Sequence, residues 1–128
     1  MSVYTLHIPA PDDFINANQR QHRYGVASRT RNWRQAGAQY ARSQKLPKLQ
    51  RARIVAELHF ADARQRDDHN YFGTIKALID GVVGDYGLLP NDNADHLVGV
   101  ELRRGAPLPR KRYGPTGAVT LIIEEVTS

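Results

Sequence analysis

The sequence contains no cysteine and, over 128 residues, only one methionine and one tryptophan. Without cysteine the chain can form neither a disulfide framework nor a thiolate metal site. It also lacks a run of eighteen apolar residues, so we expect no transmembrane segment and no membrane partner. Its first nine residues alternate, unlike the charged region and apolar block of a signal peptide. We therefore expect a cytoplasmic protein.

The composition is that of a folded domain, with 41% hydrophobic and 24% charged residues. A chain of this length suits one domain, which we assign to residues 1–128. A domain of this size buries roughly two-thirds of the surface that its unfolded chain exposes, which is enough for a hydrophobic core.

Positive charge is in excess, because eighteen basic residues oppose thirteen acidic ones and give a formal net charge of +5. Most of the basic residues are arginine, whose planar guanidinium pairs with phosphate oxygens. The sequence pI of about 9.8 suggests a polyanionic partner such as nucleic acid. Small basic proteins without such a partner have the same charge, so the excess alone does not decide the function.

Acidic residues gather in the middle of the chain. Seven of the thirteen carboxylates lie between positions 62 and 95, and basic residues dominate on both sides. An acidic centre between basic flanks is what a metal site within a phosphate-binding groove requires.

The spacing of hydrophobic residues along the sequence predicts its strands and helices. We expect strands at 3–8, 51–60, 97–102 and 118–126, and helices from Ser28 or Thr30 to about Gln44 and from Tyr71 to about Tyr86. Asn70 is the expected N-cap of the second helix, and Gly87 suits its C-terminal turn. This order predicts a single α+β domain in which a mixed β-sheet packs with two helices. The pattern leaves open whether the final strand lies at the centre or the edge of the sheet.

Asp67 precedes the second predicted helix and Asp92 follows it. A helix of about sixteen residues is roughly 24 Å long, so the two aspartates meet only if the chain folds back across it. If they meet, their carboxylates would bind a hard divalent cation such as Mg²⁺. Such an ion would polarise a phosphate oxygen and lower the pKa of a bound water. Otherwise both are solvated or capping groups.

Lys76 lies within the same helix and allows two interpretations. It can stabilise the negative charge that builds on a phosphate in the transition state. It can instead form an ion pair with Asp80, four residues further along the helix.

Three segments of the acidic centre resemble a known family. They are 66–70 (Arg-Asp-Asp-His-Asn), 76–81 (Lys-Ala-Leu-Ile-Asp-Gly) and 89–92 (Leu-Pro-Asn-Asp). The RusA family of Holliday-junction resolvases has an Arg-Asp-x-Asp-Asn box, a helix with Lys-x-x-x-Asp and a Leu-x-Asp-Asp turn. The Ile-Pro-x-Pro sequence at 8–11 is also similar, and the resemblance covers about residues 3–103.

This resemblance implies a homodimer that binds four-way DNA junctions and nicks opposed strands with Mg²⁺ or Mn²⁺. On the matched positions, Asp67 and Asp92 correspond to metal-binding aspartates. Lys76 corresponds to the helix lysine that aids cleavage, and Asn70 to the asparagine that closes the box.

Two positions depart from the family pattern. His69 stands where the box has its second aspartate, and Asn91 replaces the first aspartate of the turn. Because imidazole suits transition metals better than Mg²⁺, His69 either acts as a metal ligand that favours Mn²⁺ or does not coordinate. Asp68 or Asp95 could compensate for the lost charges.

Two basic segments flank the acidic centre and are candidate phosphate contacts, which would fix the position of DNA without reading its sequence. The second lies in a segment rich in glycine and proline, for which a solvated turn is the alternative. Trp33, between basic residues of the first helix, is expected in the core. The predicted DNA-binding residues are Arg20, Arg23, Arg103, Arg104, Arg110, Lys111 and Arg112.

Three functions remain open at this point. The first is a metal-dependent endodeoxyribonuclease that resolves four-way junctions. The second is a structure-specific DNA-binding protein with weak or lost catalysis, which His69 and Asn91 favour. The third is a single-strand or RNA-binding module, for which 8% aromatic residues offer few stacking platforms.

Overall fold

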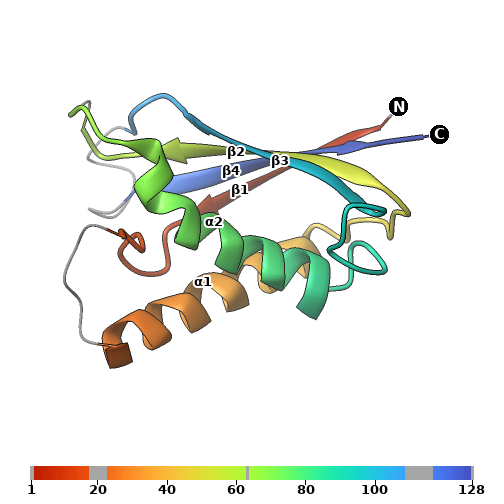
Figure 1. Cartoon of the computed structure of the whole chain (residues 1–128), viewed down its shortest axis with the longest axis horizontal. Helices are drawn as coiled ribbons and strands as arrows, with labels where there is room; N and C mark the ends of the chain where they lie inside the picture. The colour runs from red at the N-terminus through yellow and green to blue at the C-terminus, as the bar shows by residue number, and fades with distance from the viewer. Residues whose placement is uncertain (1, 18–22, 63, 109–116, 128) are drawn as a thin grey trace.

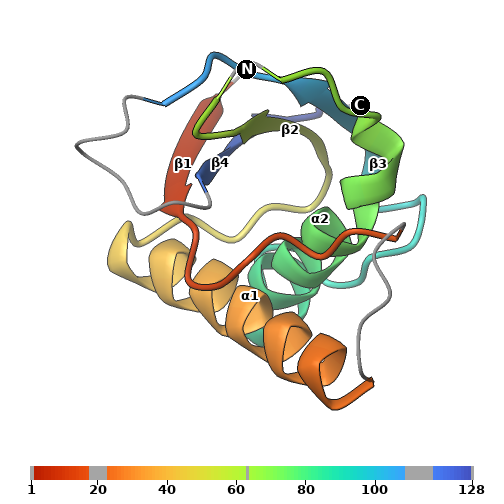
Figure 2. The same ribbon diagram turned by 90° about the vertical axis from the view of Figure 1, so that its left-hand side faces the viewer.

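The computed structural model describes residues 2–17, 23–62, 64–108 and 117–127 (Figure 1). Both helices pack on one face of a four-stranded mixed sheet, as Figure 2 shows. This α+β architecture confirms the predicted fold class. In chain order the elements are β1 (Val3–Pro9), α1 (Arg23–Ser43), β2 (Ala52–His59), the 3₁₀ helix η1 (Asp68–Tyr71), α2 (Phe72–Ile79), the π-helical η2 (Asp80–Asp85), β3 (Leu97–Arg104) and β4 (Ala118–Glu125). Within these ranges no helix has the length and apolar character needed to cross a membrane.

The strand order in the sheet is β1-β4-β2-β3. The last strand of the chain, β4, therefore lies inside the sheet and is antiparallel to both of its neighbours. β3 pairs in parallel with β2, and the chain between them crosses over through α2. The two ends of the described chain lie side by side, because Glu125 N donates to Ser2 O at 2.9 Å (Figure 1).

The core fills the space between the sheet and the two helices. Alternate residues of the strands face it, and Leu6, Ala56 and Leu121 form one buried line across three strands. Trp33 of α1 is fully buried, which confirms its predicted core position, and its Nε1 donates to the Asp13 carbonyl at 2.9 Å. The single tryptophan therefore fixes the segment after β1 against the core.

Helix α1 and the α2–η2 segment approach so closely that glycine is required at the crossing. A Cβ atom at Gly81 would lie 2.0 Å from the carbonyl oxygen of Arg34, and one at Gly37 would lie 2.7 Å from that of Leu78. Both neighbours are backbone atoms that cannot move without moving a helix. The two glycines therefore set the distance between the helices.

The first helix begins earlier than the sequence predicts. It starts at Arg23, so a start at Ser28 or Thr30 is wrong. Thr30 Oγ1 donates to the Val26 carbonyl at 2.8 Å, which satisfies the hydroxyl inside the helix rather than at its end. Hydroxyl side chains at these positions therefore do not mark a cap.

The second helix is a composite of η1, α2 and η2 rather than one regular helix. The predicted cap at Asn70 is wrong, because Asp67 caps the segment by accepting the His69 amide on its Oδ1 at 3.1 Å. Asn70 lies within η1, and its own amide donates to the Asp67 carbonyl at 3.1 Å. Gly87 has a φ of 85°, which confirms its predicted place in the left-handed turn after the helix.

Candidate functional site

The acidic residues of the predicted site lie at opposite ends of α2. Asp67, Asp68 and His69 are at its N-terminal end, whereas Asp80 begins η2 at its C-terminal end. The eight residues of α2 alone span roughly 12 Å. Asp92 lies in the turn after η2 and lines one pocket with Asp80, whereas Asp67 is not among the residues that line this pocket.

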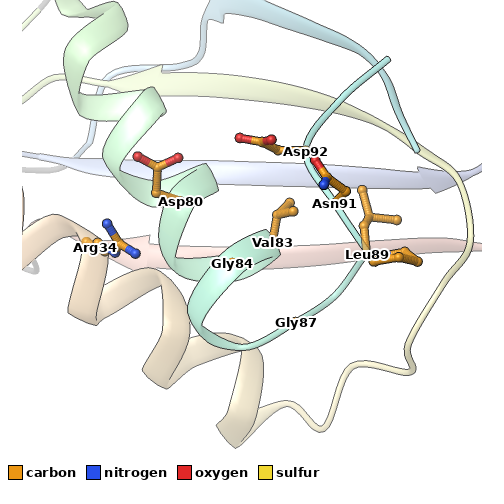
Figure 3. Close-up of a pocket in the computed structure, with 9 residues that line it drawn as sticks. Arg34, Asp80, Val83, Gly84, Gly87, Leu89, Asn91 and Asp92 are labelled. Atoms are coloured by element: carbon orange, nitrogen blue, oxygen red, sulfur yellow. The ribbon is translucent and has the colours of Figure 1, made fainter. Parts of the chain in front are cut away.

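A pocket of about 500 Å³ opens beside η2 (Figure 3). Asp80 and Asp92 both line it, and the carboxylate of Asp92 points from its turn toward the helical segment that carries Asp80. Arg34 of α1 lies on the same wall as Asp80. The pocket therefore joins α1 to the continuous stretch of chain that runs from η2 into the following turn.

The carboxylates around the pocket differ in how they are neutralised. Lys76 Nζ donates to Asp80 Oδ1 at 2.6 Å, which is the helical ion pair that the sequence offers as the alternative role of Lys76. Arg34 pairs with Asp85 through two bonds of 2.6 and 2.8 Å and lowers the pKa of that carboxyl. Asp92 is exposed and forms no hydrogen bond or ion pair with any described residue. It is therefore the carboxylate of this pocket that remains available to a ligand.

The turn that carries Asp92 is held by its own asparagines. Asn91 Oδ1 accepts the Asn93 amide and Asn93 Oδ1 accepts the Asp95 amide, each at 3.1 Å. Such side-chain-to-backbone bonds fix a turn without regular secondary structure. Leu88 and Leu89, which are buried, anchor its start in the core. Asn91, which departs from the family pattern, therefore has a structural role next to Asp92.

The N-terminal end of α2 uses its acidic residues for structure. Asp67 is exposed and is the helix cap, and Asp68 forms an ion pair of 2.8 Å with Arg104. His69 is exposed. The backbone carbonyl of Asn70 accepts a hydrogen bond from the Ala17 amide at 2.9 Å. The ligand set of Asp67, His69 and Asp92 therefore stays a prediction, since one chain does not place these side chains around one point.

The donor set of the pocket can be tested against a divalent cation. Among the described residues, no group of three or more histidine, cysteine, aspartate or glutamate side chains is arranged to hold a metal ion. Mg²⁺, however, is commonly held by one or two carboxylates and keeps several water ligands. Asp80 and Asp92 supply two carboxylates to one pocket, and its volume of about 500 Å³ leaves room for water.

Most of the predicted DNA-binding residues fall outside the described part of the chain. Arg20, Arg110, Lys111 and Arg112 lie there, and the side chain of Arg23 is not described either. Arg103 and Arg104, expected in a loop, are the last two residues of β3 because that strand is longer than predicted. Neighbours in a strand point to opposite faces. Arg103 pairs with Glu57 at 3.3 Å on the open face, whereas Arg104 turns toward η1.

Sequence reasoning assigned no site role to Asp80, and it placed Arg34 only among the basic residues around the first predicted helix that could contact phosphate. For Asp80 the signal was present, because it closes the Lys-x-x-x-Asp pattern that begins at Lys76. For Arg34 no signal indicated a place beside this pocket, since its partner Asp85 is 51 positions away.

No family model matches the sequence, and a search of curated proteins finds no match to it. The similarity to the RusA family therefore rests on the residue pattern alone.

Proposed function

We propose that the chain is a metal-dependent endonuclease that hydrolyses phosphodiester bonds in branched DNA, with four-way junctions as its substrate. The observation that carries this proposal is the pocket in which Asp80 and Asp92 lie together. These aspartates come from the helix and turn parts of the acidic pattern, which the fold joins although twelve positions separate them.

The pocket residues have distinct tasks in this proposal. Asp92, with Asp80 beside it, would hold the ion, and a bound divalent cation polarises phosphate oxygens and lowers the pKa of a water ligand. Lys76 holds Asp80 in place at 2.6 Å and keeps a positive charge where it can stabilise a developing oxyanion. Arg34 is fixed by Asp85 at the rim and offers a further positive charge to a phosphate.

The local backbone supports a functional role for this end of the helix. Asp80 begins a π-helical segment of six residues, which follows directly on α2. π-helical turns are rare and occur frequently at functional sites. Here the segment forms one wall of the pocket.

A nicking assay tests the proposal directly. A synthetic four-way junction and a linear duplex of the same sequence are each incubated with the protein in Mg²⁺ and, separately, in Mn²⁺. We expect paired nicks in opposed strands of the junction and none in the duplex. The absence of nicks in both metals would contradict the proposed activity, and equal cutting of both substrates would contradict the proposed substrate.

A structure-specific DNA-binding protein without efficient catalysis is the second candidate. It is favoured by the absence, among the described residues, of a three-ligand metal group and by the structural use of Asp67 and Asp68. This candidate predicts a stable junction complex that is not nicked in either metal.

We also propose that the protein acts as a homodimer in the cytoplasm. Paired nicks in opposed strands require two active sites, and each chain of a dimer would supply the pocket beside η2. Sedimentation equilibrium of the free protein tests the dimer: a monomer mass at micromolar concentration would contradict it.

A further inference from the structure

Arg104 connects the end of β3 to the segment that precedes η1. It lies opposite Leu58 in the parallel ladder and therefore on the helix-covered face of the sheet. Its Nε and Nη2 donate to Asp68 Oδ1 at 3.0 and 2.8 Å. Nη2 also donates to the Arg66 carbonyl at 3.1 Å, and Nη1 donates to the Arg64 carbonyl at 3.3 Å. One side chain thus binds three points of one short segment.

Phe60 provides the apolar surface on which this contact rests. Its ring is buried and packs edge-on against Tyr71, with the ring centroids 5.0 Å apart. The guanidinium carbons of Arg104 and Arg66 lie 4.7 and 4.2 Å from the centroid of the Phe60 ring. Cation–π contacts at this distance attract a guanidinium to the face of the ring.

Asp67 lies in the middle of the segment that Arg104 holds. Residues 64–67 have no regular secondary structure of their own. The residue before Asp67 is bound through its carbonyl and the residue after it through its carboxylate. Asp67 in turn accepts the His69 amide at 3.1 Å. The location of its carboxylate therefore depends on both neighbouring contacts.

We propose that Arg104 is a positioning residue, which fixes the segment around Asp67, and that it is not a DNA phosphate contact. The expected effect of Arg104 on cleavage rests on the proposed function and on the role of Asp67 that the resemblance to the RusA family implies, whereas the contacts of Arg104 depend on neither.

The donor count of Arg104 supports this assignment. A guanidinium has five N–H donors, and the bonds described above use four of them. Paired recognition of a phosphate needs two parallel donors, which the remaining one cannot supply. The side chain is also only 29% exposed, compared with 49% for Arg103. Arg103 is therefore the better placed of the two for a polyanion.

Amide hydrogen exchange of the full chain, followed by NMR, tests the positioning role without any DNA. The readout is the exchange rate at His69 and Asn70, whose amides donate to Asp67. We expect Arg104→Gln to raise both rates roughly tenfold, as the loss of a charge-assisted hydrogen bond implies. Arg104→Lys should not restore them, because one ammonium group cannot reach a carboxylate and two carbonyls together. The matched control, Arg103→Gln, should leave both rates unchanged.

Asp68→Asn provides a second variant at the other end of the contact. It should raise the same two exchange rates, and adding Arg104→Gln should have little further effect because both changes break one interaction. Unchanged rates in Asp68→Asn and in Arg104→Gln would overturn the proposal. If Arg104→Gln fails to fold, Asp68→Asn alone decides it.

Junction binding and nicking separate positioning from phosphate contact. For Arg104→Gln we expect the nicking rate at saturating junction to fall on the order of tenfold, with the KM for the junction and the salt dependence of binding unchanged. A salt slope that falls by about one in Arg104→Gln and is restored by Arg104→Lys would overturn the proposal. If the protein neither binds nor nicks junctions, the proposed function fails, while amide exchange still decides the role of Arg104.

Discussion

The two ends of α2 carry acidic residues that the structure uses in opposite ways. At the N-terminal end, Asp67 caps η1 and Asp68 is paired with Arg104, so both carboxylates have partners. At the C-terminal end, Asp92 faces a pocket without a bond to any described residue, and Asp80 is held by one lysine. At the N-terminal end of α2 the carboxylates stabilise the fold through their partners, whereas at the C-terminal end the carboxylate of Asp92 is exposed to solvent.

This difference shows that equal residue types in one sequence pattern need not have equal tasks. A carboxylate that caps a helix or accepts an arginine contributes its charge to the fold. A carboxylate without a partner can exchange water for a cation at little structural cost. The ion-binding role should therefore be sought first at Asp92, and the following changes test that comparison.

The largest effect is expected at the C-terminal end of α2, where Asp92 is exposed. Asp92→Asn should lower the nicking rate by at least on the order of 100-fold, because it removes the one carboxylate of the pocket that is not paired with a described residue. Asp80→Asn should act in the same direction. Junction affinity, measured without metal, should stay within about twofold of the wild type because asparagine does not alter the phosphate contacts. Full activity of Asp92→Asn would remove this residue from the site.

The second effect concerns the helix crossing that forms the wall of the pocket. Gly81→Ala places a methyl group against the Arg34 carbonyl, and we expect a loss of about 3 kcal/mol in the free energy of unfolding. Urea denaturation followed by circular dichroism measures it.

Gly84 offers a matched control in the same helical segment, because a Cβ built there has no atom within 4 Å apart from its chain neighbours and the backbone of its own helix. Gly84→Ala should leave the free energy of unfolding unchanged or raise it by about 0.5 kcal/mol. Equal destabilisation by both changes would show that the close crossing does not set the stability of this segment.

A smaller effect is expected at the N-terminal end of α2. Asp67→Ala should lose about 1 kcal/mol of unfolding free energy, because it removes the cap. Asp67→Asn should keep that stability, since asparagine caps as well as aspartate. The resemblance to RusA predicts that Asp67→Asn nevertheless abolishes nicking. An active and stable Asp67→Asn protein, beside an inactive Asp92→Asn protein, would restrict Asp67 to its structural role.

The smallest effect is a pH dependence of the stability near the N-terminal end of α2. A hydrogen bond from Arg66 lowers the pKa of the Asp62 carboxyl to about 2, from a usual value of 3.8. Because the folded-state pKa is lowered, this stabilisation is present above pH 3.8 and is lost as the pH falls toward 2. NMR titration of the carboxyl carbon measures the pKa. In Arg66→Gln we expect the pKa to return toward its usual value, and an unchanged pKa would contradict the bond.

The strands and the class of fold could be predicted because their signals are local. Alternation in residues 51–60 places Ile54, Ala56 and Leu58 on one face, and all three are fully buried. The same local signals failed to predict the helix starts. Thr30 and Asn70 are residue types that favour the N-cap position, but neither of them caps a helix here. Whether such a side chain caps depends on where the preceding residues lie, and that is set by tertiary packing.

The site could be predicted in part only, for a geometric reason. The sequence pattern singled out Asp67, Lys76 and Asp92, but it contains no distance between them. The length of α2 separates Asp67 from the other end, and the turn after η2 brings Asp92 to Asp80. The partners of Arg34 and Arg104 are 51 and 36 positions away, so no spacing rule could reveal them.

The most direct test of the central claim is the location of a bound paramagnetic ion. Mn²⁺ is added in substoichiometric amounts to ¹⁵N-labelled protein, and line broadening is followed at each backbone amide. We predict that broadening is centred on Asp80 and Asp92 and is lost in Asp92→Asn. Broadening centred on Asp67 and His69 instead, or no localised broadening at all, would contradict a metal site in the pocket beside η2.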